Sequence, residues 1–316
     1  MMKEYKKLIK PSPSVKKPIK EELKKVEIEI DRSTLEENLQ ELNELTGLDN
    51  VKNEVKTLIN YIKIQKERKK AGLKVINNSY HCIFTGSPGT GKTTIARLIG
   101  KIYKNLGVLK RGHFIETDRS GLVSKYVGQT ATKVNEIIDS ALDGVLYIDE
   151  AYSLVGKGEI YGMEALATLV KRMEDNRDRI VIILSGYTEE MKKFMDSNTG
   201  FKSRFNRYID FVDYEPDELL KIFKYQCDKF EYKLDDKAES KLVEVIGASY
   251  SNKDNSFGNG RFIRNIFEKC VEKQSNRIAG TNMNKWFPSF NKEKLITITG
   301  EDIPSEHSKI DSNCLI

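Results

Sequence analysis

Residues 86–93 read GSPGTGKT, and this octapeptide constrains the fold more than any other part of the chain. It has the pattern GxxxxGK[ST], it follows an apolar run at 82–84, and a helical pattern begins at 94. Glycines in such a loop let backbone N–H groups turn toward phosphate oxygens, a lysine places a charge at the β- and γ-phosphates, and a hydroxyl is offered to Mg²⁺. The sequence therefore predicts a site for ATP or GTP with Mg²⁺, formed by Gly86, Ser87, Pro88, Gly89, Thr90, Gly91, Lys92, Thr93 and Thr94.

The composition is typical of a globular protein. With 316 residues, 39% of them hydrophobic and 32% charged, the chain is long enough for two compact units. No stretch approaches the roughly 18 apolar residues that cross a bilayer, and the lysine-rich N-terminus lacks the apolar segment of a secretory signal. The four cysteines are scattered without a CxxC pair, which argues against a zinc site and against disulfides. We expect no membrane span and a cytoplasmic location.

Much of the net charge of +6 lies at the start of the chain. Lysines there are interrupted by three prolines, so residues 1–32 are predicted to form a flexible basic arm. The alternative is a docking segment or one that binds a polyanion. The last residues, 305–316, lack the apolar density to fold alone and are predicted to be a tail.

Between the predicted arm and the predicted tail, the sequence shows helical and strand-like patterns. A capping box at 33–36 opens a helix with Leu35, Leu39 and Leu42 on one face, and Asp49 is expected to cap a second helix. Strand patterns then alternate with helical ones, which predicts an α/β fold over residues 33–214, with a parallel five-stranded sheet and helices on both faces. After Pro216 helical periodicity takes over, so residues 215–304 are predicted to form an all-α unit. The strands are expected near 82–85, 113–117, 144–149, 179–185 and 208–212, and the helices near 92–106, 130–142, 161–175 and 187–196.

Two carboxylates, Asp149 and Glu150, end the third predicted strand in the form of a Walker B element. Asp149 is expected to hold the hydration shell of Mg²⁺, and Glu150 to orient and polarise the attacking water. The presence of Glu150 favours hydrolysis over binding alone. At the end of the next strand, Ser185 or Tyr187 is placed to sense the γ-phosphate, and the alternative is a strand end that merely exposes a hydroxyl.

Arginines occur at two points where they suit a phosphate. Arg204 lies just before the fifth strand and suits an arginine finger supplied by a neighbouring subunit, with Arg207 as the competing candidate. Arg261 and Arg264 are three residues apart at the start of a helix and so share a face. If Arg261 reaches back to the bound phosphates, the helical unit is a lid whose angle reports the nucleotide. Ordinary solvated arginines are the alternative in both places.

A short segment after the second strand points beyond the nucleotide. Lys125, Tyr126, Val127 and Gly128 form an apolar finger that would line the central pore of a ring and grip extended polypeptide. The alternative is that Tyr126 packs into the core of its own domain.

Taken together, these motifs resemble the AAA+ ATPases, and within them the group that contains the stage V sporulation protein K and the red-type Rubisco activases. The resemblance runs from about residue 41 to residue 304 and rests on 45–48, 86–93, 125–130, 148–152, 185–187, 200–204 and 258–261. It implies an AAA+ P-loop fold with a helical lid, and a homo-hexameric ring that hydrolyses ATP with Mg²⁺ to remodel a protein client.

The same resemblance implies roles for single residues. The segment from Leu45 to Leu48, with Gly47 and Leu48 as the binding residues, would lie near the adenine. Tyr126 would lie in the pore, Arg204 in a neighbour's site and Arg261 in its own. The lysine-, asparagine- and isoleucine-rich composition favours a sporulation-type relative over a photosynthetic one.

Two functions of other classes compete with this one. A nucleic-acid motor or loader is favoured by the basic arm and the isoelectric point of about 8.8, but the apolar finger argues against it. A nucleotide-gated scaffold without catalysis is opposed by Glu150.

Overall fold

The computed structural model describes residues 33–76, 79–126, 128–155, 160–197, 199–254, 257–280 and 291–304. The predicted arm at 1–32, the predicted tail at 305–316 and Val127 of the predicted finger lie outside these residues. Within the described part of the chain, no helix combines the length and the apolar character that crossing a bilayer requires.

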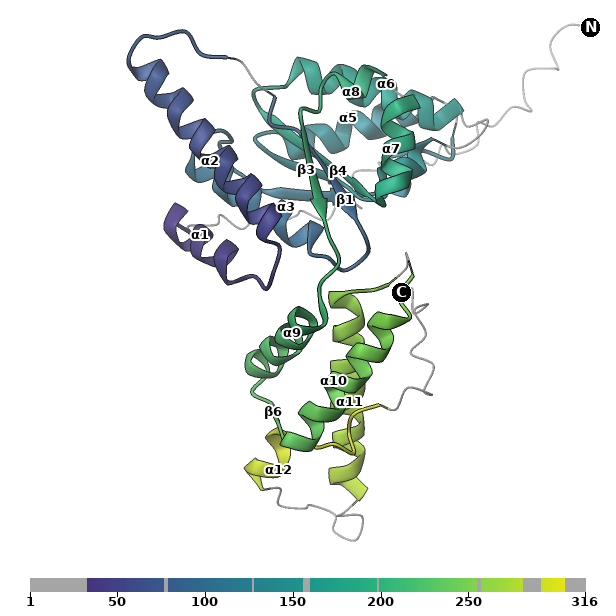
Figure 1. The fold of residues 1–316 in the computed structure, drawn as a ribbon. Helices are drawn as coiled ribbons and strands as arrows, with labels where there is room; N and C mark the ends of the chain where they lie inside the picture. The colour runs from purple at the N-terminus through teal and green to yellow at the C-terminus, as the bar shows by residue number, and fades with distance from the viewer. Residues whose placement is uncertain are drawn as a thin grey trace, which may run out of the picture. The chain divides into compact units, whose positions relative to one another are not determined.

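A parallel five-stranded sheet forms the centre of the α/β part, which confirms the predicted fold class (Figure 1). The strand order is β2-β3-β4-β1-β5, and each neighbouring pair is parallel. The C-terminal ends of all five strands therefore lie at the same edge of the sheet. The strands are β1 (Cys82–Gly86), β2 (Phe114–Thr117), β3 (Gly144–Ile148), β4 (Ile180–Gly186) and β5 (Arg207–Phe211).

Helices cover both faces of the sheet, which is why most residues of its central strands are apolar. Phe84 and Tyr147 point into the core shared with α2 and α3, whereas Ile83 and Leu146 point into the core on the opposite face. The helices on the first side are α1 (Leu35–Glu44), α2 (Asp49–Lys70) and α3 (Lys92–Asn105). Those on the second side are α5 (Thr130–Ala141), α6 (Ile160–Asp175), α7 (Thr188–Ser197) and α8 (Thr199–Lys202), and the short α4 (Arg119–Leu122) and η2 (Ala151–Leu154) follow β2 and β3.

The first two helices begin differently from the prediction. The capping box of α1 lies one residue later than expected: Thr34 Oγ1 accepts from the Glu37 N–H at 3.2 Å, and the Glu37 carboxylate accepts from the Thr34 N–H at 2.7 Å. The prediction that Asp49 caps α2 was wrong, because the N-cap is Leu48, with a φ of 59°, and no side chain caps the helix. Asp49 is instead the first helical residue, where the positive end of the helix dipole stabilises its negative charge.

The part that follows β5 is helical apart from one very short sheet. It contains α9 (Pro216–Lys229), α10 (Asp236–Ser251), α11 (Gly260–Gly280) and α12 (Lys292–Ile296). The strands β6 (Lys233–Leu234) and β7 (Thr297–Ile298) pair in parallel. The sequence analysis did not predict this pair, because two residues are too few to show an alternating pattern.

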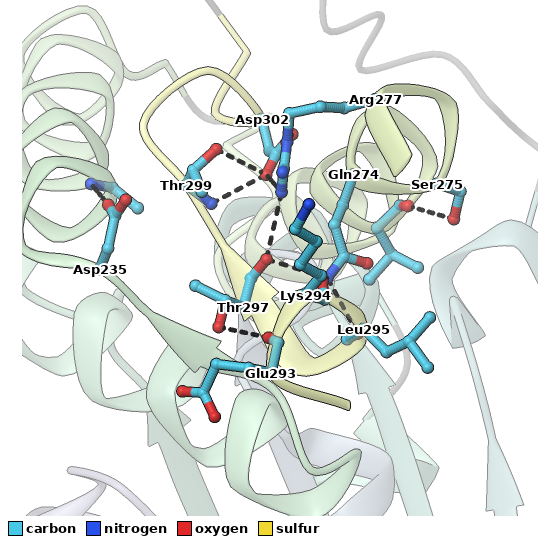
Figure 2. A network of polar contacts seen from close by, with 12 residues as sticks. Asp235, Gln274, Ser275, Arg277, Glu293, Lys294, Leu295, Thr297, Thr299 and Asp302 are labelled. Atoms are coloured by element: carbon cyan, nitrogen blue, oxygen red, sulfur yellow. Dashed lines mark hydrogen bonds and ion pairs between the residues drawn. The ribbon is translucent and has the colours of Figure 1, made fainter. Parts of the chain in front are cut away.

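An ion pair between half-buried Arg277 and buried Asp302 lies near the C-terminal end of this helical part (Figure 2). Asp302, which is 1% exposed, accepts two hydrogen bonds from Arg277 of α11, at 2.9 and 2.8 Å, and two more from the backbone and hydroxyl of Thr299. Burial raises the pKa of Asp302, but these hydrogen bonds outweigh it, and the pKa lies below its usual value. Gln274 of α11 donates to the carbonyl oxygen of Thr297 at 3.0 Å. Helix α11 therefore holds the segment 297–302 in place through side chains.

Three cysteines lie in the described residues, and all three are buried free thiols. Burial raises the pKa of Cys82, Cys227 and Cys270 to about 12 in each case. They are therefore protonated core side chains at neutral pH, with little thiolate to react.

Candidate functional site

A cavity of about 990 Å³ lies at the end of the sheet where β1, β3 and β4 finish. Because the three strands are parallel, this arrangement brings separate sequence motifs to one place. Among the described loop residues, Ser87 and Thr90 do not line the cavity, and Thr90 is fully buried. The predicted site residues that line it are Gly86, Pro88, Gly89, Gly91, Lys92, Thr93, Thr94, Asp149, Glu150 and Arg261.

Lys92 lies across the phosphate loop that it follows. Its ammonium group donates to the carbonyl oxygens of Gly86 and Ser87 at 2.8 and 2.7 Å. Burial lowers the pKa of Lys92 to about 8, although the charge of Asp149 opposes this effect. A phosphate would compete with these two carbonyls for the ammonium group, and its negative charge would favour the protonated form.

The loop is also hydrogen-bonded by the segment that links β5 to α9 and by residues at the start of α11. The carbonyl oxygens of residues 88, 89 and 90 accept from Asn259 Nδ2 at 3.3 Å, from the Gly260 N–H at 3.0 Å and from the Tyr214 hydroxyl at 3.3 Å. Three consecutive loop carbonyls are thus engaged by the segment before α9 and by the start of α11. The phosphate loop and the lid are therefore joined directly through the loop backbone.

Asn259 is the centre of this junction. It is fully buried, has a φ of 48°, and its Oδ1 accepts from the Tyr214 N–H at 2.9 Å while Nδ2 reaches Asp213 at 2.9 Å. The approach of the two segments is so close that a Cβ atom on Gly89 would lie 2.1 Å from the carbonyl oxygen of Gly258. Any side chain at position 89 would separate the lid from the loop.

The two carboxylates at the end of β3 have different surroundings. Asp149 Oδ1 accepts from the hydroxyl of Ser185 and from the Glu150 N–H, the latter at 3.1 Å. Glu150 is exposed and has a φ of 47°, a left-handed conformation that turns its side chain away from the direction of the strand. Ser185 itself is fully buried, and its neighbour Tyr187 lines the cavity.

Tyr147 is a cavity-lining residue that the sequence analysis did not single out. It is 1% exposed, and its hydroxyl accepts from Thr93 Oγ1 at 3.3 Å. Burial raises the pKa of Tyr147, and the negative charge of Asp149 raises it further, so the phenol keeps its proton. In an apolar strand such as VLYI an aromatic residue is read as core, and no pattern signals that its hydroxyl reaches a site.

The lid lines the wall of the cavity that faces the loop. Arg261 and Arg264 are exposed there, and the chain before α2 contributes Leu45 and Thr46. The lid also lines this cavity with apolar and aromatic side chains, of which Tyr225 and Phe230 are exposed. Such side chains suit the flat face of a base. Besides Arg261 and Arg264, the lid residues that line the cavity include Ile222, Tyr225, Gln226, Lys229, Phe230, Phe267 and Glu268.

Gly47 and Leu48, expected beside the adenine, lie next to this wall and not on it. Leu48 is 5% exposed in the core beneath Gly91. A Cβ atom on Gly47, which has a φ of 58°, would lie 2.1 Å from a carboxylate oxygen of Glu218. These two residues shape the turn that presents Leu45 and Thr46 to the cavity.

The predicted finger lies on the surface. Tyr126 is 70% exposed, Lys125 and Gly128 are also exposed, and Gly128 has a φ of 73°. The alternative in which Tyr126 packs into the core of its own domain is therefore wrong. Ser124 Oγ accepts from the Tyr126 N–H at 3.1 Å, which fixes the backbone at the base of the finger.

Arg204 is half-buried and held in place within its own chain. Its guanidinium donates to the carbonyl oxygen of Gly200 at 2.7 Å and lies 3.7 Å from the carboxylate of Glu174. Arg207, the competing candidate, lies over the ring of Tyr61 at 5.9 Å. Neither arginine lines the cavity of its own chain, as far as the described residues show.

Comparison with known proteins gives matches along most of the chain. Residues 82–212 match the ATPase family associated with various cellular activities (AAA), and residues 215–313 match the AAA lid domain. The stage V sporulation protein K of Bacillus subtilis is 41% identical over 271 residues, which cover 85% of this chain and 82% of that protein. The chloroplastic ribulose bisphosphate carboxylase/oxygenase activase of Cyanidioschyzon merolae is 38% identical, with coverage of 88% and 94%.

Other relatives are longer or more distant. The ESX-3 secretion system protein EccA3 of Mycobacterium leprae is 41% identical over 85% of this chain, which spans only 44% of that protein. The AAA domain of FIGL-1 has a similar structure, with a TM-score of 0.55 at 17% identity and coverage of 83% and 80%; that likeness concerns the fold alone. The sequence matches over both parts, together with the sheet, the lid and the phosphate loop, show that the chain belongs to the AAA+ ATPases.

Proposed function

We propose that the chain binds ATP with Mg²⁺ in the cavity at the end of the sheet and hydrolyses it to ADP and phosphate. The observation that supports this most is that Lys92, Thr93, Asp149, Glu150 and Arg261, from three distant parts of the sequence, line one cavity. Lysine and arginine attract the phosphates, and the hydroxyl and carboxylate are oxygen ligands of the kind that Mg²⁺ prefers.

Each residue has a distinct role in this proposal. Lys92 exchanges its two carbonyl partners for phosphate oxygens, and Thr93 and Asp149 hold Mg²⁺, the latter through water. Bound Mg²⁺ would neutralise negative charge on the phosphates. Glu150, exposed beside the cavity, orients and polarises the attacking water. Arg261, exposed at the start of α11, contacts the phosphates from the lid.

We also propose a homo-hexameric ring in which each site is completed by Arg204 of a neighbour. Charge develops on the γ-phosphoryl group in the transition state, and a guanidinium group stabilises it strongly. Arg204 is half-buried and anchored by Gly200 and Glu174, so the group is fixed in orientation before a neighbour arrives.

The ring is proposed to act on a protein client, which the exposed Tyr126 grips in the pore. The similarity to stage V sporulation protein K, over 85% of this chain, supports a sporulation-related role. The similarity to a Rubisco activase, over 88% of the chain, supports a red-type Rubisco activase-like role as the alternative. We propose a cytoplasmic location in either case.

The Glu150→Gln variant tests the enzymatic part. It should bind ATP about as tightly as the parent chain, because the amide keeps the size and polarity of the side chain, while steady-state phosphate release falls by about 100-fold or more. Glu189→Gln on α7 is the matched control and should leave phosphate release unchanged. Turnover of Glu150→Gln at the parent rate would refute the assignment of Glu150.

Client capture in the Glu150→Gln background tests the pore. Polypeptide retained by the ATP-bound Glu150→Gln protein should be lost when Tyr126→Ala is added and kept when Tyr126→Phe is added, because an aromatic ring suffices for non-specific apolar contact. If the Tyr126→Ala and Tyr126→Phe double variants retained equal amounts of polypeptide, the proposed role of Tyr126 would be refuted. Phosphate release stimulated by DNA or RNA, and lost steeply as salt rises, would favour the nucleic-acid motor instead.

A further inference from the structure

Glu150, the residue proposed to polarise the attacking water, has a strained backbone conformation. Its φ of 47° lies in the left-handed region, where a Cβ atom comes too close to the following carbonyl oxygen. Its N–H donates to Asp149 Oδ1 at 3.1 Å, and its carbonyl oxygen accepts from the Ser153 N–H at 2.8 Å. Both bonds lie within the turn at 149–153. Such a conformation persists only where the surrounding structure holds it, so contacts from outside the turn are required.

The segment that follows β2 makes such contacts at both ends of the turn. At the start, the Thr117 carbonyl oxygen accepts from the Asp149 N–H at 2.9 Å. At the end, Nη1 of Arg119, on α4, donates to the carbonyl oxygen of Ser153 at 2.6 Å. Thr117 and Arg119, which are two positions apart, therefore bracket the turn that contains Glu150.

The backbone that carries Arg119 is itself held against the end of β2. Asp118 caps α4, since its carboxylate accepts from the Gly121 N–H at 3.0 Å. A Cβ atom on Gly121 would lie 2.0 Å from Thr117 Oγ1, and Leu122 is buried in the core on that side of the sheet. The guanidinium group of Arg119 therefore reaches the turn from a fixed base.

We propose that Arg119 is a positioning residue that holds Glu150 in the conformation from which it polarises the attacking water. The inference rests on the proposed role of Glu150 in hydrolysis. Arg119 is not among the described residues that line the cavity, so it acts through the Ser153 carbonyl group and not on the nucleotide. A hydrogen bond from a charged donor is about twice as strong as one between neutral groups. Without it, the end of the turn loses its contact with α4, and the left-handed conformation of Glu150 is free to relax.

Hydrogen exchange in the nucleotide-free chain tests the structural part of this proposal. Arg119→Met removes the donor and keeps most of the aliphatic stem, and Arg119→Ala removes both, so two variants carry the test. Each should accelerate exchange of the Ser153 amide, whose bond to the Glu150 carbonyl oxygen closes the turn, by about 10-fold. Unchanged exchange of this amide in the variants would overturn the proposal.

Phosphate release tests the functional part. Each variant should bind a fluorescent ATP analogue within about twofold of the parent, which shows that the site is folded, while kcat falls by about 10-fold or more because Glu150 is misplaced. KM for ATP should change by no more than about twofold. In single turnover of the Glu150→Gln protein, adding Arg119→Met should lower the residual rate by less than about twofold, because no carboxylate remains to be positioned.

Arg111→Ala is the matched control, since Nη2 of Arg111 also donates to a backbone carbonyl group, that of Leu142, at 2.7 Å. Leu142 lies before the start of β3, and so away from the turn that follows this strand. The control should leave both the exchange of the Ser153 amide and phosphate release unchanged.

Two kinetic results would overturn the positioning role alone. One is a kcat for Arg119→Met equal to that of the parent, and the other is an equal loss from Arg119→Met in the parent and in the Glu150→Gln protein. Turnover of Glu150→Gln at the parent rate would instead overturn the assignment of Glu150, and the positioning role with it.

Discussion

His81, immediately before β1, is a buried histidine whose Nδ1 atom already accepts a hydrogen bond. It is 2% exposed, Nδ1 accepts from the Ile182 N–H at 3.0 Å, and its ring lies 5.7 Å from that of Phe205. Burial lowers the pKa of His81 to about 4. A second proton would bring Nδ1–H against the Ile182 N–H, so the neutral form is the one that fits between β1 and β4.

Because the pKa of His81 is lowered in the folded protein, we expect the protein to lose stability in mild acid. As the pH falls below about 6.5, His81 becomes protonated in the unfolded chain, whereas in the folded chain it stays neutral until about pH 4. The free energy of unfolding therefore decreases between these two pH values. Between pH 7 and pH 5.5 the loss from this group is about 1 kcal/mol. His81→Asn, which offers an oxygen near the position of Nδ1 and does not titrate, should be less stable at pH 7 but lose less on acidification, as measured by urea unfolding at both values. Identical pH dependence in both proteins would contradict the assignment.

Single residues differ in how well the sequence predicts them. Lys92 and Thr93 stand in a motif in which backbone geometry dictates the residue type, and Asp149 follows an apolar strand of recognisable length, so all three could be assigned to one cavity in advance. Tyr147 could not, because the side of a strand on which a hydroxyl emerges, and what it meets there, depend on β4 and α3 lying beside it. The segment from Leu45 to Leu48 is a mixed case: Leu45 and Thr46 line the cavity, whereas the left-handed backbone of Leu48 buries its side chain, and no sequence pattern predicts that turn.

At the scale of elements, strong periodicity predicted what the structure has. The five strands and the long helices of the α/β part lie within a few residues of their predicted ranges, because buried parallel strands and amphipathic helices each leave a long pattern. The elements that the sequence missed, such as α4, α8 and the pair β6 and β7, have two to four residues each. They exist because neighbouring elements hold them, as α11 holds β7 through Gln274.

The junction between the phosphate loop and α11 depends on Asn259. Asn259→Gly keeps the positive φ and removes the hydrogen bonds to residue 88, Asp213 and Tyr214. If the local free energy of opening falls by about 2 kcal/mol, amide exchange in the first turns of α11 should accelerate about 30-fold. We also expect ATP to protect this segment less than it does in the parent, as measured by hydrogen exchange with and without nucleotide.

Asn252→Gly is the matched control for that experiment. Asn252 follows α10, is exposed, and its side chain donates to the Ala248 carbonyl oxygen of the same helix. This substitution should leave exchange in α11 as it is. Unchanged exchange in the Asn259→Gly protein would show that the junction does not hold α11 to the loop.

At the scale of the whole molecule, the proposed ring makes each site a shared one. Arg204→Ala subunits should bind ATP and fail to turn it over, and Lys92→Ala subunits should fail to use ATP while still presenting Arg204. In a random 1:1 mixture about a quarter of all sites combine an intact Lys92 with a neighbour's intact Arg204, so phosphate release should recover to about one quarter of the parent rate per subunit.

Arg207→Ala supplies the comparison, since Arg207 is the nearest arginine in sequence and lies over Tyr61. Its turnover should stay within a few-fold of the parent. If no mixing ratio restores phosphate release, a neighbour does not complete the site. If Arg207→Ala loses turnover and Arg204→Ala keeps it, Arg207 and not Arg204 is the arginine that a neighbour supplies.

The hydrogen bond from the Gly260 N–H to the carbonyl oxygen of residue 89 joins backbone to backbone. Such a bond does not depend on side-chain chemistry, so lineages can exchange the surrounding residues and keep the attachment, provided that positions 89 and 260 stay small. Proline at 260, the first residue of α11, is the replacement that deletes the donor while a helix start tolerates it. The attachment of lid to loop is therefore resistant to substitution, and divergence among relatives is expected to fall on residues away from this backbone contact.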